Sequence, residues 1–218
     1  MDASFWLQRW QAGQIGFHLP VVNPLLTRFW NTLAVAEGTP VWVPLCGKSQ
    51  DMAWLHDRGH PVIGVEISRT AIEGFDREQA LKLHWQDMPP FSLATGDGYQ
   101  LYCGDYFAVT RGMLEGVGAA YDRAALIAMP SSLRREYVDR FNRCLAPGWR
   151  LLLITLDYPQ HQRAGPPFSV DDAEVRELFA GCAIELLGDE DVLPDHSHFA
   201  AQGVTVLRER VYAITDRG

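Results

Sequence analysis

The feature of the sequence that most constrains its fold is the segment Val41–Ser68, which predicts a strand, a helix and a second strand in succession. A short apolar run leads into a tight turn at Gly47, a helix follows, and a second apolar run over Val62–Val65 closes on Glu66. Units of this kind build parallel sheets, in which ligands bind beyond the carboxyl ends of the strands. We therefore expect Gly47 and Glu66 to lie side by side at one sheet edge, where a nucleoside could span them.

The turn itself narrows the class of nucleotide that this edge could bind. The dinucleotide fingerprint G-x-G-x-x-G is absent, since Gly47 is flanked by Cys46 and Lys48. The Walker phosphate loop is absent as well, because no glycine stands five residues before Gly47. A carboxylate about 20 residues after a glycine turn suits the two hydroxyls of a ribose, since one Glu can accept from both. Glu66 is thus a candidate ribose ligand, with a solvated strand end as the alternative.

Composition and charge limit the classes of protein and partner. With 218 residues, 47% hydrophobic and 21% charged, the chain fits one α/β domain, with a helical cover at 1–35 and a sheet core over 40–218. The net charge of −8, with scattered acidic residues, argues against a nucleic-acid partner. No stretch approaches 18 apolar residues and the start has no basic leader, so we expect a soluble cytoplasmic protein with no membrane partner. Four widely spaced cysteines predict free thiols rather than a zinc site.

Three further predicted strands end in polar residues or lie at the centre of the sheet. Tyr99–Cys103 is followed by Asp105, which is either a turn aspartate or an acceptor for an exocyclic amine such as that of adenine. Ala119–Asp122 is followed by Arg123, which either pairs with the aspartate before it or faces the pocket. The run Trp149–Leu156 is almost wholly apolar and is predicted to be a central strand.

The first 30 residues are rich in large rings. These rings are Phe5, Trp6, Trp10, Phe17, His18, Phe29 and Trp30. Trp6 and Trp10 share a helix face, so they either staple this helix to the sheet or form a lid over a flat, partly apolar ligand. Gly13 and Gly16 loosen the chain after them, which suits a cover that orders on binding.

Two other segments complete the expected fold. Arg69–His84 is predicted to be a helix, and the runs 183–187 and 204–214 are predicted to be the last two strands, paired as a hairpin at the sheet edge. The loop between these strands contains His196 and His198. Their spacing matches no strong zinc pattern, so a solvated loop is favoured over a metal site.

Together, these segments resemble class I S-adenosylmethionine-dependent methyltransferases. More specifically, the chain is similar to the bacterial branch of the thiopurine S-methyltransferase family from Trp6 to Tyr212. The similarity rests on PLCGK at 44–48, DRGH at 57–60, GVEIS at 64–68, DRAAL at 122–126 and GPPF at 165–168. One departure is Ala124, where the family motif Asp-Arg-Gly-Ala-Leu has glycine.

The resemblance implies a Rossmann-like fold of seven mostly parallel strands, the last antiparallel, with helices on both faces and an N-terminal aromatic lid. It implies S-adenosyl-L-methionine as the cofactor, no metal, and methylation of the sulfur of a thiopurine or related aromatic thiol. In the bacterial branch the acceptors extend to selenium and tellurium compounds, which are linked to tellurite resistance. We also expect a monomer.

The resemblance also assigns site residues. The residues expected at the cofactor are Trp6, Trp10, Leu45, Gly47, Glu66, Asp105, Tyr106 and Arg123. Within this set, Glu66 is expected at the ribose and Asp105 and Tyr106 at the adenine, while Phe17 and Arg123 are expected beside the acceptor.

The mechanism follows from the chemistry of the donor. A sulfonium is already activated, so the protein need only hold a soft nucleophile in line with the methyl group. Arg123 or a bound water is expected to stabilise the thiolate, while Phe17 and the tryptophan lid stack on the ring and exclude water. Two other classes stay open: a methyltransferase for an oxygen, nitrogen or metalloid acceptor, and a non-enzymatic nucleoside-binding module. The aromatic cover argues against the second, because a sensor need not exclude water.

Overall fold

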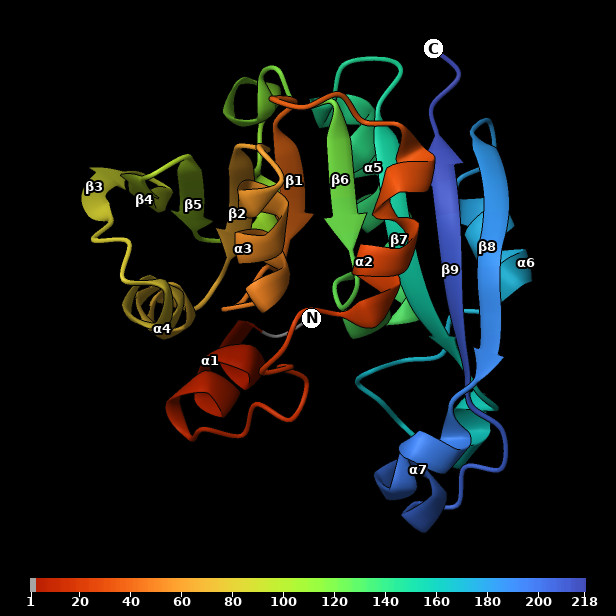
Figure 1. The fold of residues 1–218 in the computed structure, drawn as a ribbon. Coiled ribbons are helices and arrows are strands. Elements are labelled where there is room, and N and C mark those ends of the chain that lie inside the picture. The colour runs from red at the N-terminus through yellow and green to blue at the C-terminus, as the bar shows by residue number, and fades with distance from the viewer. Residues whose placement is uncertain (1–2) are drawn as a thin grey trace.

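A nine-stranded mixed sheet forms the centre of the molecule, with the strand order β3-β4-β5-β2-β1-β6-β7-β9-β8 (Figure 1). The structure, a computed structural model, describes residues 3–218. The strands are β1 Val41–Pro44, β2 Val62–Glu66, β3 His84–Met88, β4 Phe91–Gly96, β5 Tyr99–Cys103, β6 Ala119–Asp122, β7 Arg150–Asp157, β8 Ala183–Asp191 and β9 Arg208–Thr215. The α-helices are α1 Ala3–Gln11, α2 Pro24–Phe29, α3 Gln50–Asp57, α4 Arg69–Gln79, α5 Ser131–Cys144, α6 Asp172–Leu178 and α7 Ser197–Ala201.

The topology places a binding crevice between β1 and β6. The strands β5, β2, β1, β6 and β7 run parallel, and β9 lies antiparallel to β7. The chain leaves β1 toward β2 and β5 on one side and later enters β6 on the other, so the strand order reverses there. Ligands of open α/β sheets bind at such a reversal, beyond the carboxyl ends of the strands. The expected Rossmann-like fold with an antiparallel last strand is confirmed, and the arrowheads of β1 and β6 mark the carboxyl ends of these strands (Figure 1).

The sheet has nine strands rather than the expected seven, because β3 and β4 add an antiparallel hairpin at one edge. The helix expected over Arg69–His84 ends at Gln79, where Ala80 is left-handed (φ 54°) and its N–H caps the helix on the Asp76 carbonyl. Because β3 is a largely exposed edge strand, its sequence has no clear alternation of buried residues to predict it. At the opposite edge, the expected hairpin of the last two strands is confirmed as β8 and β9.

Two apolar layers cover the sheet, as the alternation along β1 shows. Val41 and Val43 contribute to the layer shared with α2, α3 and α4, whereas Trp42 contributes to the layer shared with α5. In Figure 1, α2 and α3 lie in front of the sheet and α5 lies behind it. The Trp42 ring packs on Tyr106 and Phe141, with centroid distances of 5.6 and 4.8 Å. Burial on both faces explains why β1, β2 and β6 are wholly buried.

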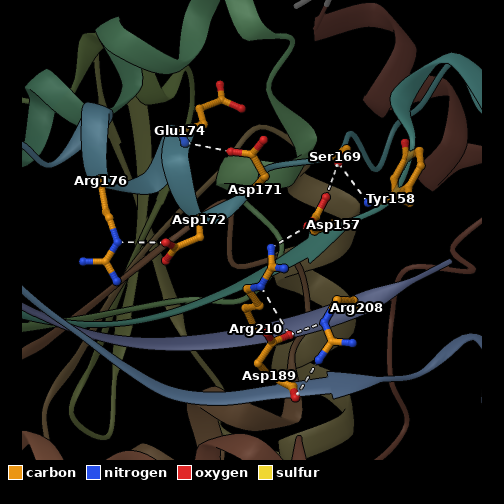
Figure 2. A network of polar contacts seen from close by, with 10 residues as sticks. All are labelled: Asp157, Tyr158, Ser169, Asp171, Asp172, Glu174, Arg176, Asp189, Arg208 and Arg210. Carbon is orange, nitrogen blue, oxygen red and sulfur yellow. Dashed lines mark hydrogen bonds and ion pairs between the residues drawn. The ribbon is translucent and has the colours of Figure 1, made fainter.

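A ladder of ion pairs ties the antiparallel edge to the parallel part of the sheet (Figure 2). Arg210 on β9 pairs with Asp157 at the end of β7 and with Asp189 on β8. The Asp157 carboxylate also accepts from the Ser169 hydroxyl, which in turn accepts from the Tyr158 N–H. These contacts anchor both ends of the loop that follows β7.

We predict that Arg210→Met lowers the free energy of unfolding by about 1–3 kcal/mol, because two partly buried carboxylates lose their shared cation. The side chains of Arg210, Asp157 and Asp189 are 13%, 25% and 30% exposed. Denaturant unfolding followed by circular dichroism measures the change. The matched control is Arg176→Met, which breaks an exposed pair with Asp172 within α6 and is expected to leave the midpoint unchanged (Figure 2). Equal midpoints for the two variants would contradict the prediction.

Candidate active site

One cavity of about 940 Å³ lies beyond the carboxyl ends of the central strands, at the reversal of strand order. Its volume is in the range of roughly 300–1,000 Å³ that holds small molecules and cofactors in proteins. All of the residues that the sequence assigned to the site line this cavity. They are Trp6, Trp10, Phe17, Leu45, Gly47, Glu66, Asp105, Tyr106 and Arg123. The fold therefore brings together the N-terminal segment, the turn after β1 and the tips of β2, β5 and β6.

Two left-handed residues shape the turn after β1. Leu45 has φ 48° and Gly47 has φ 55°. Leucine is rare in that conformation, and an observed outlier of this kind points to a functional constraint. A Cβ atom added to Gly47 would lie 3.0 Å from the ring of Trp10. The indole therefore packs directly on the backbone of the turn, and glycine leaves the room for it.

The carboxylate of Glu66 joins the ends of β1 and β2. Its Oε2 accepts the Gly47 N–H at 2.9 Å, and its Oε1 accepts the Ser68 N–H at 2.8 Å. The expected proximity of Gly47 and Glu66 is thus confirmed. Burial raises the pKa of Glu66 to about 7, although the N–H groups of Ser68, Gly47 and Ile67 oppose the rise. Each carboxylate oxygen still has a lone pair for another donor, such as a hydroxyl group in the cavity.

Arg123 lines the cavity, and the aspartate before it has other partners. Asp122 is buried, and its carboxylate accepts the Ala125 N–H and the Tyr137 hydroxyl. Burial raises the pKa of Asp122 to about 6. Arg123 instead donates from Nη1 to the Phe17 carbonyl at 3.2 Å. Of the two arrangements that the sequence left open, the structure has the guanidinium in the cavity.

The N-terminal segment covers the cavity on the side away from the sheet. In Figure 1, α1 lies below the arrowheads of the central strands, and its Trp10 is buried. The Phe17 ring meets the rings of Trp6 and Trp10 edge-on, with centroid distances of 5.4 Å in both pairs. Trp10 both packs on the turn and lines the cavity, as a staple and a lid would. Opening of this segment stays a prediction.

At the tip of β5, Asp105 and Tyr106 line the cavity in different ways. Asp105 is exposed, and its Oδ1 caps the following turn by accepting the Phe107 N–H at 2.9 Å. Its Oδ2 has no partner among residues 3–218 and is available to an amine. Tyr106 is buried, stacks on Trp42 and donates its hydroxyl to the Tyr137 carbonyl at 2.8 Å. Because that hydroxyl is engaged in the core, a contact of Tyr106 with a cofactor is expected to use its backbone.

The cavity also contains side chains that the sequence analysis did not assign to it. These include Asp51, Arg163, His196, His198, Phe199 and Glu209. The two histidines were expected in a solvated loop, and His198 is exposed. The connection between β8 and β9 also folds back as α7, so both histidines line the cavity. No local pattern indicated this, because the position of the histidines depends on how the segment between β8 and β9 folds back. Asp51 had a signal, since it lies in the first turn of the helix that follows the glycine turn. Within residues 3–218, no group of three or more His, Cys, Asp or Glu is placed to hold a metal.

Comparison with solved structures defines the fold. The whole chain superposes on a SAM-dependent methyltransferase from Anabaena variabilis with a TM-score of 0.68, 15% identity and 96% coverage of that chain. It also superposes on the 1,6-didemethyltoxoflavin-N1-methyltransferase of Burkholderia thailandensis, solved with S-adenosylhomocysteine bound, with a TM-score of 0.65 and 13% identity. That match covers 99% of this chain and 87% of the other. These likenesses show that the chain has the Rossmann-like fold of class I S-adenosylmethionine-dependent methyltransferases.

Comparison of sequences narrows the class to a family. The family profile described as Thiopurine S-methyltransferase (TPMT) matches residues 1–217. The thiopurine S-methyltransferases of Pseudomonas fluorescens strains Pf0-1 and SBW25 are 47% and 46% identical to this chain, covering 98% and 100% of it and 99% and 100% of the relatives. The chain belongs to the thiopurine S-methyltransferase family. It is a methyltransferase whose cofactor is S-adenosyl-L-methionine, as its motifs predicted.

We predict that Gly47→Ala weakens the binding of S-adenosylhomocysteine by about tenfold or more, because the added methyl group displaces Trp10 from the turn. Gly38→Ala is the matched control. Gly38 has φ +81° and no neighbour within 4 Å of an added Cβ, so this variant imposes backbone strain without a clash. Calorimetric titration and melting temperature are measured on both. Similar loss of binding in the two variants would show that strain, and not the packing of Trp10, controls the site.

Proposed function

We propose that this protein transfers the methyl group of S-adenosyl-L-methionine to the sulfur of thiopurines or related aromatic and heterocyclic thiols. The observation that carries the proposal is that the rings of Trp6, Trp10 and Phe17 line one cavity together with the guanidinium of Arg123. Rings suit a flat aromatic acceptor, and a fixed cation suits the thiolate that it forms on ionisation. The relatives at 46–47% identity are named for the same acceptor class.

For the cofactor, the geometry supports a pose along the tips of β1, β2 and β5. Glu66 is assigned to the ribose hydroxyls, because its carboxylate lies in the cavity wall and keeps acceptor capacity beside Gly47. Asp105 is assigned to the adenine amine through Oδ2. Leu45 and Trp10 border the same space and would supply apolar contact.

Catalysis in this site rests on positioning and electrostatics. The bound cofactor supplies an activated methyl group. The protein holds the acceptor sulfur at near-attack distance, and Arg123 stabilises its negative charge. Phe17 and the tryptophans pack on the acceptor ring and exclude water. An aromatic thiol ionises near neutral pH, so the site needs no strong general base.

The proposal includes the expected partners. The cavity has the volume of a small-molecule site, which supports small molecules as the partners, and a monomer stays a prediction. The net charge of −8 disfavours nucleic acid. Within residues 3–218, every helix is too short or too polar to traverse a lipid bilayer. A cytoplasmic location and activity on selenium or tellurium compounds stay predictions.

We predict that Glu66→Gln weakens the binding of S-adenosylhomocysteine by roughly 2 kcal/mol, about thirtyfold, because a charge-assisted contact with the ribose is lost. The pKa of Glu66 is raised to about 7, so at pH 6.5 the free protein carries this group largely protonated. Hydroxyl donors favour the carboxylate, so binding releases a proton and weakens as the pH falls below 7.

Calorimetric titrations at pH 6.5 in two buffers of different ionisation enthalpy measure that proton. Wild type is expected to release more than half of a proton per ligand, and Glu66→Gln none. Glu73→Gln, which removes an exposed carboxylate paired with Arg69, is the control and is expected to match wild type. Unchanged affinity in Glu66→Gln would remove Glu66 from the ribose site.

We predict that wild type methylates the sulfur of a thiopurine but not the oxygen of the matched oxopurine, because the site stabilises a soft anion without a strong base. Arg123→Ala is expected to lower kcat/KM for the thiopurine by about tenfold to a hundredfold. Product is identified by mass spectrometry, with the affinity for S-adenosylhomocysteine as the control. A change within about twofold would exclude Arg123 from thiolate stabilisation. If the protein methylates an oxygen or nitrogen acceptor and leaves the thiopurine unmethylated, the proposed substrate class is wrong.

A further inference from the structure

A buried carboxylate, Asp51, lies in the cavity wall beside Arg123. Asp51 is only 1% exposed and belongs to the first turn of α3. Its Oδ1 accepts the Asn23 N–H at 2.7 Å, and its Oδ2 accepts the Tyr121 hydroxyl at 3.0 Å. The same Oδ2 lies 3.9 Å from Nε of Arg123. One carboxylate therefore contacts the N-terminal segment, β6 and the arginine that follows β6.

Asp51 and Arg123 contact each other, and each also binds the backbone of the N-terminal cover. Arg123 donates from Nη1 to the Phe17 carbonyl, and Asp51 accepts from the backbone of Asn23. The stretch 17–23 is therefore tied at one end to the guanidinium and at the other end to the carboxylate that faces it. With Nε beside Asp51 and Nη1 on the cover, Nη2 is left without a partner among residues 3–218 and is available to the cavity.

Asp51 and the Phe17 carbonyl are both placed to orient Arg123, and of these two groups only Asp51 carries a charge. The positive charge of Arg123 acts to lower the pKa values of four nearby groups, which are His18, Tyr121, Asp122 and Glu209. Of the carboxylates within residues 3–218, however, only Asp51 comes within 4 Å of the guanidinium. Asp122 is engaged by the Ala125 N–H and the Tyr137 hydroxyl. The first turn of α3 also favours a negative charge at Asp51, because the helix dipole is positive there.

We propose that Asp51 is a positioning residue for methyl transfer, which orients Arg123 toward the acceptor and ties that orientation to closure of the N-terminal cover. The proposal rests on the proposed role of Arg123. Asp51 is assigned no proton transfer with the acceptor: its two oxygens hold the Asn23 N–H and the Tyr121 hydroxyl. Its negative charge orients the Arg123 guanidinium, and its hydrogen bond to the Asn23 N–H holds the N-terminal cover in place.

The test is the variant Asp51→Asn, which keeps the shape of the side chain and removes its charge. Its amide oxygen can still accept from Asn23, and its amide nitrogen can donate to the Tyr121 oxygen, so the fold is expected to persist. We expect kcat/KM for a thiopurine to fall by about tenfold or more. We also expect the acid limb of the pH profile of kcat, which reports ionisation of the bound thiol, to move to higher pH, because Arg123 is no longer held toward the sulfur. The affinity for S-adenosylhomocysteine is expected to stay within about threefold.

Two variants separate positioning from a structural role. Asp172→Asn removes the corresponding first-turn charge of α6, which lies outside the cavity and pairs with Arg176 (Figure 2), and is expected to match wild type. Asp51→Glu restores the charge and is expected to return the acid limb toward its wild-type position. A lower melting temperature with an unchanged pH profile would show that Asp51 serves the fold alone and would overturn the proposal.

Hydrogen exchange distinguishes failure of this inference from failure of the proposed acceptor class. In Asp51→Asn, the hydrogen bond from the Asn23 N–H loses its charge assistance, so we expect faster amide exchange over 17–23 than in wild type, whatever the acceptor turns out to be. If wild type leaves thiols unmethylated, the proposed function fails, and the exchange data still test the link from Asp51 to the cover. Unchanged exchange together with kcat/KM within about twofold of wild type would overturn the positioning role.

Discussion

The structure depends on one buried carboxylate that joins two strand ends. Glu66 accepts the N–H groups of Gly47 and Ser68, so it holds the turn after β1 against the tip of β2. Burial alone would neutralise this group, and its pKa is raised to about 7 for that reason. Two backbone donors offset the cost and keep acceptor capacity at the edge where the strand order reverses. The site is therefore built into the connection between the strands.

The position of the N-terminal aromatic cover depends on the same turn after β1. Because Gly47 has no side chain, the Trp10 indole rests on its backbone, and the rings of Trp6 and Phe17 pack around that indole. The Phe17 carbonyl then accepts from Arg123, so the aromatic cover and the cation of the site are joined by a direct bond. The proposed recognition of a flat ring and the proposed stabilisation of an anion therefore depend on one arrangement of residues.

Residues of the site were predictable where they follow strands in the sequence. Glu66, Asp105 and Arg123 each lie at the end of a predicted strand or within two residues after it, and parallel strands place such positions at one edge. The edge hairpin of β3 and β4 was missed, because an exposed strand carries little periodic signal. The entry of His196 and His198 into the cavity was missed too, since it depends on how α7 folds back after β8.

The sequence by itself determined the parallel core, the family and the set of polar residues at the strand ends, because apolar periodicity and turn chemistry act over a few neighbouring residues. Only the tertiary structure decided that Arg123 turns to Phe17 and Asp51 while Asp122 turns to Tyr137. Adjacent side chains leave a strand in opposite directions, and the partners that each one meets are set by packing between distant segments. Long-range packing, which no local pattern encodes, therefore assembled the site.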